Sequence, residues 1–406
     1  MKLKFSAWYR SQLDKHKTRE KEKRFPRLPS LRPSALTPSS SQENLAQGCL
    51  LFKRLPYELR REILVLAFGN RRVHMDLSFE HPSAVYTPGQ HRTLKGTAVD
   101  PTGTYGRREK VDYKQPKSWR WWGGMCNRYE PDPDPRRNFP GPMGSQGPPG
   151  PWDDYCRFGC GMKCHQLPAN IHWKCHIGAM GWLLSCRQAY KEGIEVLYKT
   201  NTISMSSEVM ITYLPEVLLP QRLAAMTSIE LMWPLKCDIQ EGQNPVLKLD
   251  YLDVLFTLLS SHFRGLTSLY IALQTADDLR YSRDWLDAES VLKKFDNLVP
   301  QIPGLVECVI AFPRTTLDKL LKTALDALKA QRKSQDQVDC YRYIWRFLDD
   351  GEHVLTERPN NIYPDPPSRL LESGDKRTNM GYWISDSHYD EATIRITEIS
   401  CFGGGL

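Results

Sequence analysis

LTSLYIAL, at residues 266–273, decides the fold because it has two counterparts at a nearly constant distance. MTSIELMW begins 40 residues earlier, at Met226, and LVECVIAF begins 39 residues later, at Leu305. Each stretch is a short, mostly apolar run of strand length. Repetition at one period therefore indicates three equivalent strands.

Two segments of helical pattern separate these strands: 249–263 (LDYLDVLFTLLSSHF) and 285–299 (WLDAESVLKKFDNLV). The alternation predicts a βαβαβ unit, either a parallel sheet with right-handed crossovers or an irregular leucine-rich-repeat-like stack. We therefore predict a repeat-like α/β domain over 206–350, within a chain of the α+β or α/β class.

The sequence beyond this unit predicts two further helices, at 315–330 and 336–348, and a loop at 355–380. Residues 392–400 (ATIRITEIS) alternate between apolar and polar side chains, as an edge strand does. The region 351–406 is thus predicted to be a C-terminal loop and edge strand.

A second informative stretch is 53–68 (KRLPYELRREILVLAF), which predicts a short helix with Pro56 at its first position. Its apolar stripe comprises Leu55, Leu59, Ile63 and Leu66. The charged residues assigned to the other side are Glu58, Arg60, Arg61 and Glu62. A helix this short is not stable alone, so the stripe must be buried, either in its own domain or partly against another protein.

The other strong helical pattern is 181–200 (GWLLSCRQAYKEGIEVLYKT), followed by a short strand at Ile203–Met205. Apolar side chains spaced by three or four residues line one face of this helix: Leu183, Cys186, Tyr190, Ile194 and Leu197. We predict that the two helices, although distant in the chain, pack on each other.

These two stretches carry a resemblance. LPYELRREILVLAF followed by HMDLSFEHP, and later GWLLSCRQAYKEGIEVLYKTNTIS, resemble a fungal family of uncharacterised proteins with LPxELRRxI and CRQxYxEGxxVLYxTN motifs. The match covers about 50–82 and 119–233. The family looks F-box-like, which implies an F-box-like helical region, here 49–205.

The F-box resemblance implies a partner. In F-box proteins the LP-led helices bind the small adaptor subunit of a cullin–RING ubiquitin ligase, which would assign partner binding to Leu55, Pro56, Leu59 and Ile63. In an F-box the helices form one compact run, whereas here a long insert, 70–180, separates them. The alternative is that the helices only pack on each other.

The N-terminal region 1–48 is predicted to be a disordered basic arm. Residues 1–34 hold eleven Lys or Arg against three acidic residues, a surplus of eight that equals the net charge of the whole chain, +8. Such an arm suits nuclear import, contact with nucleic acid or anionic lipid, or a solvated tail. No secretory signal or membrane span is evident, so we expect an intracellular protein, nuclear or cytoplasmic.

The insert 70–180 contains a Pro/Gly-rich segment and then a Cys/His-rich one. Four Cys and three His fall within the 21 residues 156–176, a density that suits tetrahedral zinc, although the three-residue gaps are not those of a standard zinc knuckle. The predicted ligands are Cys156, Cys160, Cys164 and either Cys175 or His176. Upstream, three tryptophans within 119–122 predict an aromatic cluster.

Sequence motifs of catalysis are not found: the chain lacks a GxSxG elbow, a P-loop and an HExxH motif. His74, His81 and His91 are assigned to the loop after the first helix. We therefore predict a protein-interaction module and not an enzyme, and the resemblance implies an F-box-like substrate adaptor of a cullin–RING ubiquitin ligase. The alternative is a nuclear, zinc-containing nucleic-acid-binding protein that uses the basic arm.

Overall fold

The computed structural model describes residues 50–80, 114–125, 177–238, 246–275, 286–331, 341–349, 351, 353–357, 369–370, 376–377 and 380–386. The predicted arm 1–48, the zinc ligands and the strand at 392–400 lie outside these residues. Within the described residues, no helix combines the length and the apolar character that a membrane crossing requires.

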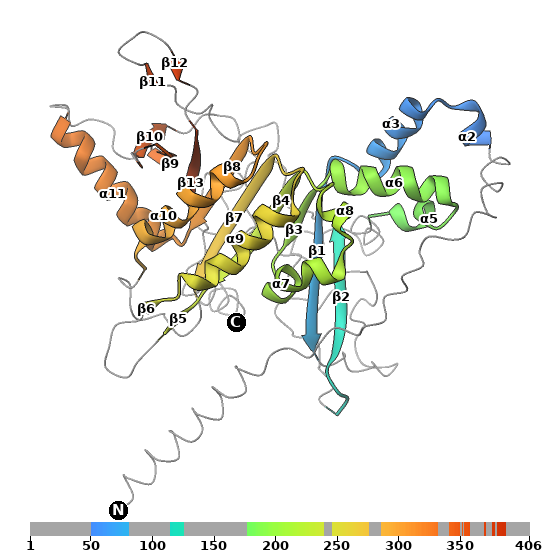
Figure 1. Ribbon diagram of the computed structural model, residues 1–406, viewed down its shortest axis with the longest axis horizontal. Coiled ribbons are helices and arrows are strands. Elements are labelled where there is room, and N and C mark those ends of the chain that lie inside the picture. Colours follow the sequence, from blue (N-terminus) through green and yellow to red (C-terminus); the bar gives the residue numbers. More distant parts are fainter. Residues whose placement is uncertain are drawn as a thin grey trace, which may run out of the picture.

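A mixed sheet organises the described part of the chain, where nine strands pair in the order β10-β9-β13-β8-β7-β4-β3-β1-β2 (Figure 1). Their bounds are β1 Arg72–Glu80, β2 Ser118–Met125, β3 Thr202–Met205, β4 Ser228–Leu235, β7 Ser268–Thr275, β8 Glu307–Phe312, β9 Tyr341–Phe347, β10 His353–Glu357 and β13 Gly381–Asp386. Two small two-stranded sheets pair β5 (Cys237–Asp238) with β6 (Val246–Leu247), and β11 (Arg369–Leu370) with β12 (Lys376–Arg377).

The predicted βαβαβ unit is confirmed as a parallel sheet. β4, α9 (Asp250–His262), β7, α10 (Ala288–Leu298) and β8 follow one another, and the three strands pair in parallel. Their register aligns the repeats residue by residue, because Leu231 lies opposite Ile271 and Ile271 lies opposite Ile310. A short 3₁₀ helix, η6 (Val299–Gln301), follows α10.

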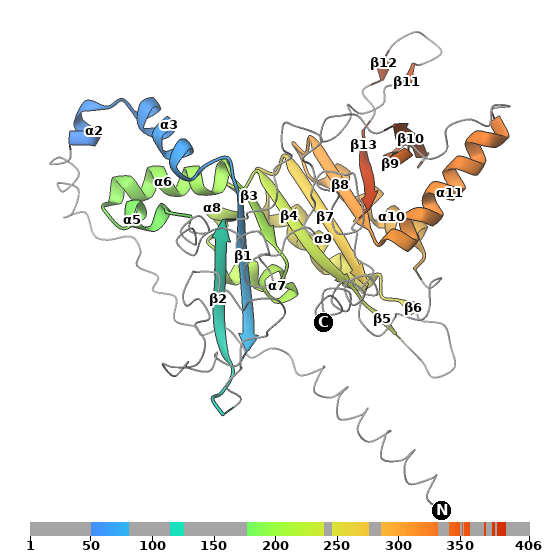
Figure 2. The same ribbon diagram turned by 180° about the vertical axis from the view of Figure 1, so that it is seen from behind.

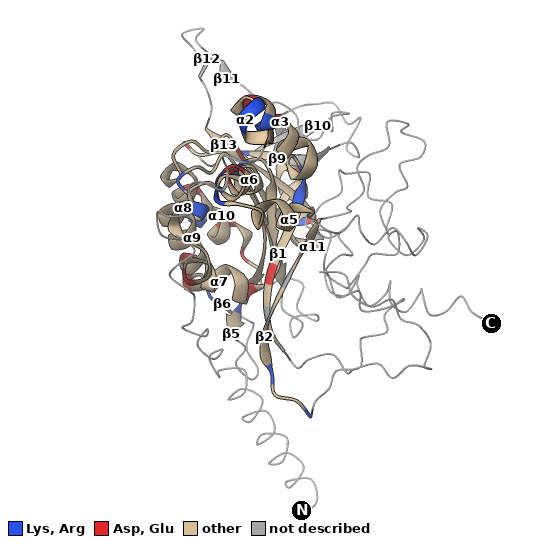
Figure 3. Ribbon diagram, turned by 90° about the vertical axis from the view of Figure 1, so that its right-hand side faces the viewer, with Lys and Arg blue, Asp and Glu red and all other residues tan. Residues whose placement is uncertain are grey.

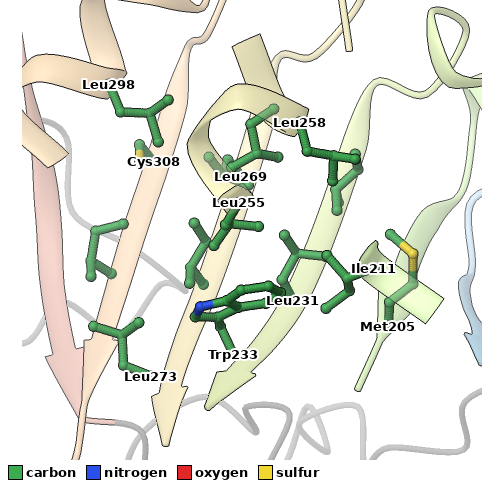
Figure 4. Packing of buried hydrophobic residues seen from close by; sticks show 14 of the residues in the cluster. Met205, Ile211, Leu231, Trp233, Leu255, Leu258, Leu269, Leu273, Leu298 and Cys308 are labelled. Atoms are coloured by element: carbon green, nitrogen blue, oxygen red, sulfur yellow. The ribbon is translucent and has the colours of Figure 1, made fainter. Parts of the chain in front are cut away.

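The main core lies between this sheet and the helices on one of its faces. α7 (Glu208–Val217), α9 and α10 lie on the same side of the sheet, as the side view shows (Figure 3). Figure 4 shows Leu255 and Leu258 of α9 close to Leu231, Trp233 and Leu269 of the strands, all within one buried cluster. The strands are nearly continuous apolar runs because their other face is buried too, at Met232, Ala272 and Ala311.

The sheet extends beyond the βαβαβ unit on both sides. Strand β3, predicted at Ile203–Met205, pairs in parallel with β4 and β1, and β1 pairs antiparallel with β2. On the other side, β13 pairs in parallel with β8 and antiparallel with β9, and β9 pairs with β10. Strands from 49–205 and from 351–406 therefore belong to the same sheet as those of 206–350.

The helix predicted at 336–348 is wrong where the structure describes it, because Tyr341–Phe347 is strand β9. Its side chains alternate between two clusters: Ile344 joins the main core, whereas Trp345 and Phe347 pack on the other face of the sheet. Short apolar runs do not separate strand from helix by periodicity alone. The loop predicted at 355–380 also begins with the end of β10.

The other predicted helix of this region is confirmed as α11 (Arg314–Gln331), whose Leu317 joins the main core. A short α8 (Pro220–Leu223) links α7 to β4. α7 begins beside a buried carboxylate: Asp76 accepts hydrogen bonds from the backbone N–H groups of Ser206 and Ser207 and from the Ser206 hydroxyl. Burial raises the pKa of Asp76, while these donors act in the opposite direction.

Candidate docking surface

The two motif-bearing helices belong to a helical unit at one end of the sheet. It comprises α2 (Leu50–Arg54), α3 (Tyr57–Phe68), α5 (Ala179–Leu183) and α6 (Arg187–Lys199), and we call it the front lobe. Figures 1 and 2 show these helices together beyond the end of the sheet where β1 and β3 begin. α3 leads directly into β1, and α6 leads directly into β3.

The predicted packing of the two motif helices is confirmed, with one difference in the second. The segment 181–200 is not one helix, because α5 ends at Leu183 and α6 begins after Cys186. The Cys186 sulfur accepts a hydrogen bond from the N–H of Ala189 and so caps α6. The lobe has its own buried cluster: Leu64, Phe68, Ala179, Leu183, Ile194 and Val196.

The apolar face of α3, expected to be buried in its own domain or partly against another protein, is exposed in this chain. Leu59, Ile63 and Leu66 are 53%, 46% and 78% exposed, respectively. The face that packs on α6 carries Arg60, Leu64 and Phe68, at positions i, i+4 and i+8. Arg60, which was assigned to the charged outer side, is therefore a buried residue.

A buried ion pair explains this orientation of α3. Arg60 Nε and Nη2 donate to the two carboxylate oxygens of Glu192 in α6, at 3.0 and 2.6 Å, and Gln188 donates to the same carboxylate at 2.6 Å. Burial acts to raise the pKa of Glu192, but the hydrogen bonds from Arg60 and Gln188 outweigh burial and lower it. The Arg60 guanidinium also lies over the Phe52 ring of α2, 5.3 Å from its centroid.

Asn201 binds the C-terminal ends of α3 and α6. Its side-chain Nδ2 donates to the carbonyls of Phe68, at 3.0 Å, and Leu197, at 2.9 Å, and its Oδ1 accepts from the N–H of Arg71, at 2.8 Å. Asn201 is completely buried. One side chain thus satisfies carbonyls at the ends of α3 and α6 and a backbone donor between α3 and β1.

Close approach of α5 and α6 requires a glycine. A Cβ added at Gly193 would lie 2.6 Å from Cδ1 of Trp182, a ring carbon held in the lobe. Arg60, Glu192, Gly193 and Asn201 therefore serve contacts between the helices, and Gln188 supports Glu192 from within α6. The joint occurrence of the two motifs follows from this geometry, since each motif supplies the partners of the other.

The outer face of α3 is the candidate site. Leu59, Ile63 and Leu66 stand at i, i+4 and i+7, so they form one strip, which we call the docking strip. Glu58 and Glu62, also four residues apart and exposed, border it on one side. Further large apolar side chains are exposed elsewhere on the lobe: Leu50, Tyr57, Met180 and Leu184.

The predicted partner-binding residues divide into two groups. Leu59 and Ile63 lie on the docking strip, whereas Leu55 and Pro56 form the turn between α2 and α3. Pro56 is exposed and precedes α3 as its N-cap, one position before the predicted one. Leu55 is half-buried, and its carbonyl accepts a hydrogen bond from Arg60 Nη1.

The other predicted site is the zinc site of the Cys/His-rich segment. Cys156, Cys160, Cys164, Cys175 and His176 lie outside the described residues, so the zinc site stays a prediction. Within the described ranges, no group of His, Cys, Asp or Glu side chains has the arrangement of a metal site.

A polar row on the second face of the sheet was missed. His74, assigned to a loop, lies buried in β1, in register with Ser204 of β3, and Ser204 is in register with Glu230 of β4. Glu230 forms an ion pair with Arg72, with Arg72 Nε and Glu230 Oε2 3.0 Å apart. The HMDLS sequence, which alternates polar and apolar residues, carried the signal for this strand.

Comparison with known proteins extends the picture in one respect. Residues 145–317 match the model of a family described as a domain of unknown function, DUF7730. The match spans α5, α6 and the whole βαβαβ unit, and it stops just inside α11. No curated protein and no solved structure gives a significant match to this chain.

Proposed function

We propose that this chain is a protein-interaction module whose docking strip binds a partner protein. In its finer form, the proposal makes the chain an F-box-like substrate adaptor: the strip binds the small adaptor subunit of a cullin–RING ubiquitin ligase, and the sheet domain presents a client. The proposal assigns the chain a binding role and no catalytic step.

The observation that carries the proposal is the orientation of α3. A short helix normally turns its most apolar stripe inward, because burial of apolar surface contributes about 25 cal/mol per Å². Here the inward face carries a buried arginine beside Leu64 and Phe68, and a leucine–isoleucine–leucine strip faces outward. Contiguous exposed apolar side chains with a polar border are typical of protein-binding sites.

The LP-led position of this helix supports the finer proposal. The strip follows directly after Leu55 and Pro56, on the helix that carries the F-box resemblance. The long insert does not separate the helices in space, since Arg60 and Glu192 are in contact. Residues distant in the chain thus form a compact pair of helices.

The test is a pull-down of the purified adaptor subunit by the full chain. Ile63→Asp and Leu66→Asp should each weaken binding roughly tenfold or more, as the loss of a central apolar contact does. Val254→Asp, at an exposed position of α9 outside the lobe, is the matched control and should bind normally. The free energies of unfolding of all three variants should lie within about 0.5 kcal/mol of the wild-type value, because the substituted side chains are exposed.

The outcomes separate the two levels of the proposal. A wild-type chain that does not bind the adaptor, but binds another protein in a manner lost on Ile63→Asp, removes the ligase role and keeps the docking strip. Variants that bind every partner as the wild type does remove both.

A further inference from the structure

The docking strip specifies the chemistry of what can cover it. Three apolar side chains, Leu59, Ile63 and Leu66, offer about two turns of contact, and Glu58 and Glu62 add negative charge along one border. An amphipathic helix with an apolar stripe and basic flanks matches this surface.

This chain itself contains such a sequence. In MKLKFSAWYRSQL, residues 1–13, the apolar residues Phe5, Trp8, Tyr9 and Leu13 are spaced at i, i+3, i+4 and i+8. On a helix this spacing forms one stripe, and Lys4 and Arg10 flank it on either side. The first acidic residue of the chain is Asp14, so the segment is purely basic.

We propose that residues 2–13 bind the docking strip of the same chain as an amphipathic helix and compete there with the external partner. The competition rests on the proposed function, whereas the contact within the chain does not. Trp8 and Leu13 supply the apolar contacts to Ile63 and Leu66. Lys4 or Arg10 pairs with Glu58 and Glu62.

The connection between the two elements permits this contact. Residues 14–49, 36 in number, join the segment to α2, which begins at Leu50 beside α3. A chain of that length spans roughly 120 Å when extended, whereas α3 is about 18 Å long. A tethered ligand acts at an effective concentration on the order of millimolar, so even a weak contact is substantially populated.

The experiment uses the full-length chain with p-benzoylphenylalanine, a photo-crosslinker, in place of Leu66. Irradiation should join position 66 to residues 2–13 of the same polypeptide, as peptide mass spectrometry of the monomer band will show. The crosslinker in place of Val306, an exposed position outside the lobe, is the control and should not reach that segment.

Charge reversal tests the recognition itself. The exposed pair of substitutions Glu58→Lys and Glu62→Lys should lower the yield of this crosslink roughly threefold to fivefold, as the loss of two surface ion pairs does. Adding Lys4→Glu and Arg10→Glu to the same chain should restore the yield, because the opposite charges face each other again.

Three results would overturn the proposal. These are a crosslink only between two copies of the chain, a crosslink only to other segments, or a yield that is insensitive to both charge reversals. None of them depends on whether an adaptor subunit binds, so the proposed function and this inference can fail separately.

Discussion

Each end of the sheet has a buried arginine that joins distant segments of the chain: Arg60 in the front lobe and Arg346 at the opposite end. Arg60 joins α3 to α6 through one carboxylate, that of Glu192. Arg346 in β9 joins the hairpin formed by β9 and β10 to α10 through two carboxylates, those of Asp296 and Glu289. Both pairings are between chain segments that are distant in sequence, and the first lies beneath the exposed docking strip.

The surroundings of Arg346 differ from those of Arg60. Arg346 Nη1 also donates to the carbonyl of Gly351 at 3.1 Å and lies 2.8 Å from Nε2 of His353, while the Tyr382 hydroxyl donates to Asp296 at 2.9 Å. Gly351 has a φ of +70°, and a Cβ there would lie 2.9 Å from Arg346 Nη2. The hairpin turn is therefore shaped around the guanidinium. The Arg346 side chain is therefore enclosed by groups from α10, β10 and the turn, whereas the front lobe presents the docking strip.

Removing the Arg346 charge should have the largest effect. Arg346→Met leaves Asp296 without its ion-pair partner in a largely buried position, so we expect the free energy of unfolding to fall by about 3–5 kcal/mol. Urea unfolding followed by tryptophan fluorescence measures it. Lys294→Ala, which removes a surface ion pair with Asp253 on the neighbouring helix, is the control and should cost less than about 1 kcal/mol. An equal loss in both variants would contradict a special role for Arg346.

The corresponding change in the front lobe should be smaller and local. Arg60→Met should destabilise α3 by about 2–3 kcal/mol, because the Glu192 carboxylate is left buried with only Gln188 to bind it. Hydrogen exchange should show lost protection in α3 and α6 and unchanged protection in β4, β7 and β8. The double variant Arg60→Met, Glu192→Leu should recover much of the loss. Loss of protection throughout the sheet would show that the two ends of the molecule are not independent.

The smallest effect concerns pH near Arg346. Burial lowers the pKa of His353 below its usual 6.5, and the adjacent Arg346 lowers it further, against the opposing effect of Glu289 and Asp296. As pH falls below about 6.5, the unfolded chain binds the proton first, so stability present above that pH is lost.

His353→Gln should remove this contribution, because an amide can still accept a hydrogen bond from Arg346 but does not titrate. Between pH 7 and pH 5 the wild type should therefore lose up to about 1 kcal/mol more than the variant. Parallel thermal melts of both proteins in this range provide the measurement. Identical pH profiles would show that the pKa of His353 is not lowered in the folded chain.

The sequence predicted the central sheet well because its signal is local and repeated. Leu231, Ile271 and Ile310 occupy equivalent positions of three similar runs, and the intervening helices show regular apolar spacing. The same rule failed for β9, where the apolar run was too short to separate two periods. A strand order that brings β13 between β8 and β9 depends on pairing between distant segments, which no local pattern encodes.

The docking surface could be predicted only in part. Leu59 and Ile63 were identified from their spacing, but the spacing left open whether they face their own domain or a partner protein. The pairing of Arg60 with Glu192, 132 positions away, turns the Arg60 face of α3 toward α6. The spacing did not predict this, because a charged residue in a surface pattern normally indicates a solvated face. The signal was present in the two motifs, since each contains a charge that matches the other.

Asn201 has a mechanical consequence. Because its amide binds the last residue of α3 and also residues of α6 and of the link to β1, a swing of α3 relative to the sheet would break the hydrogen bond from Asn201 to the Phe68 carbonyl. A protein bound to the outer side of α3 would thus have a fixed orientation relative to the strands. A second protein bound at the opposite edge of the sheet, at β10, would then stay at a constant distance from the first.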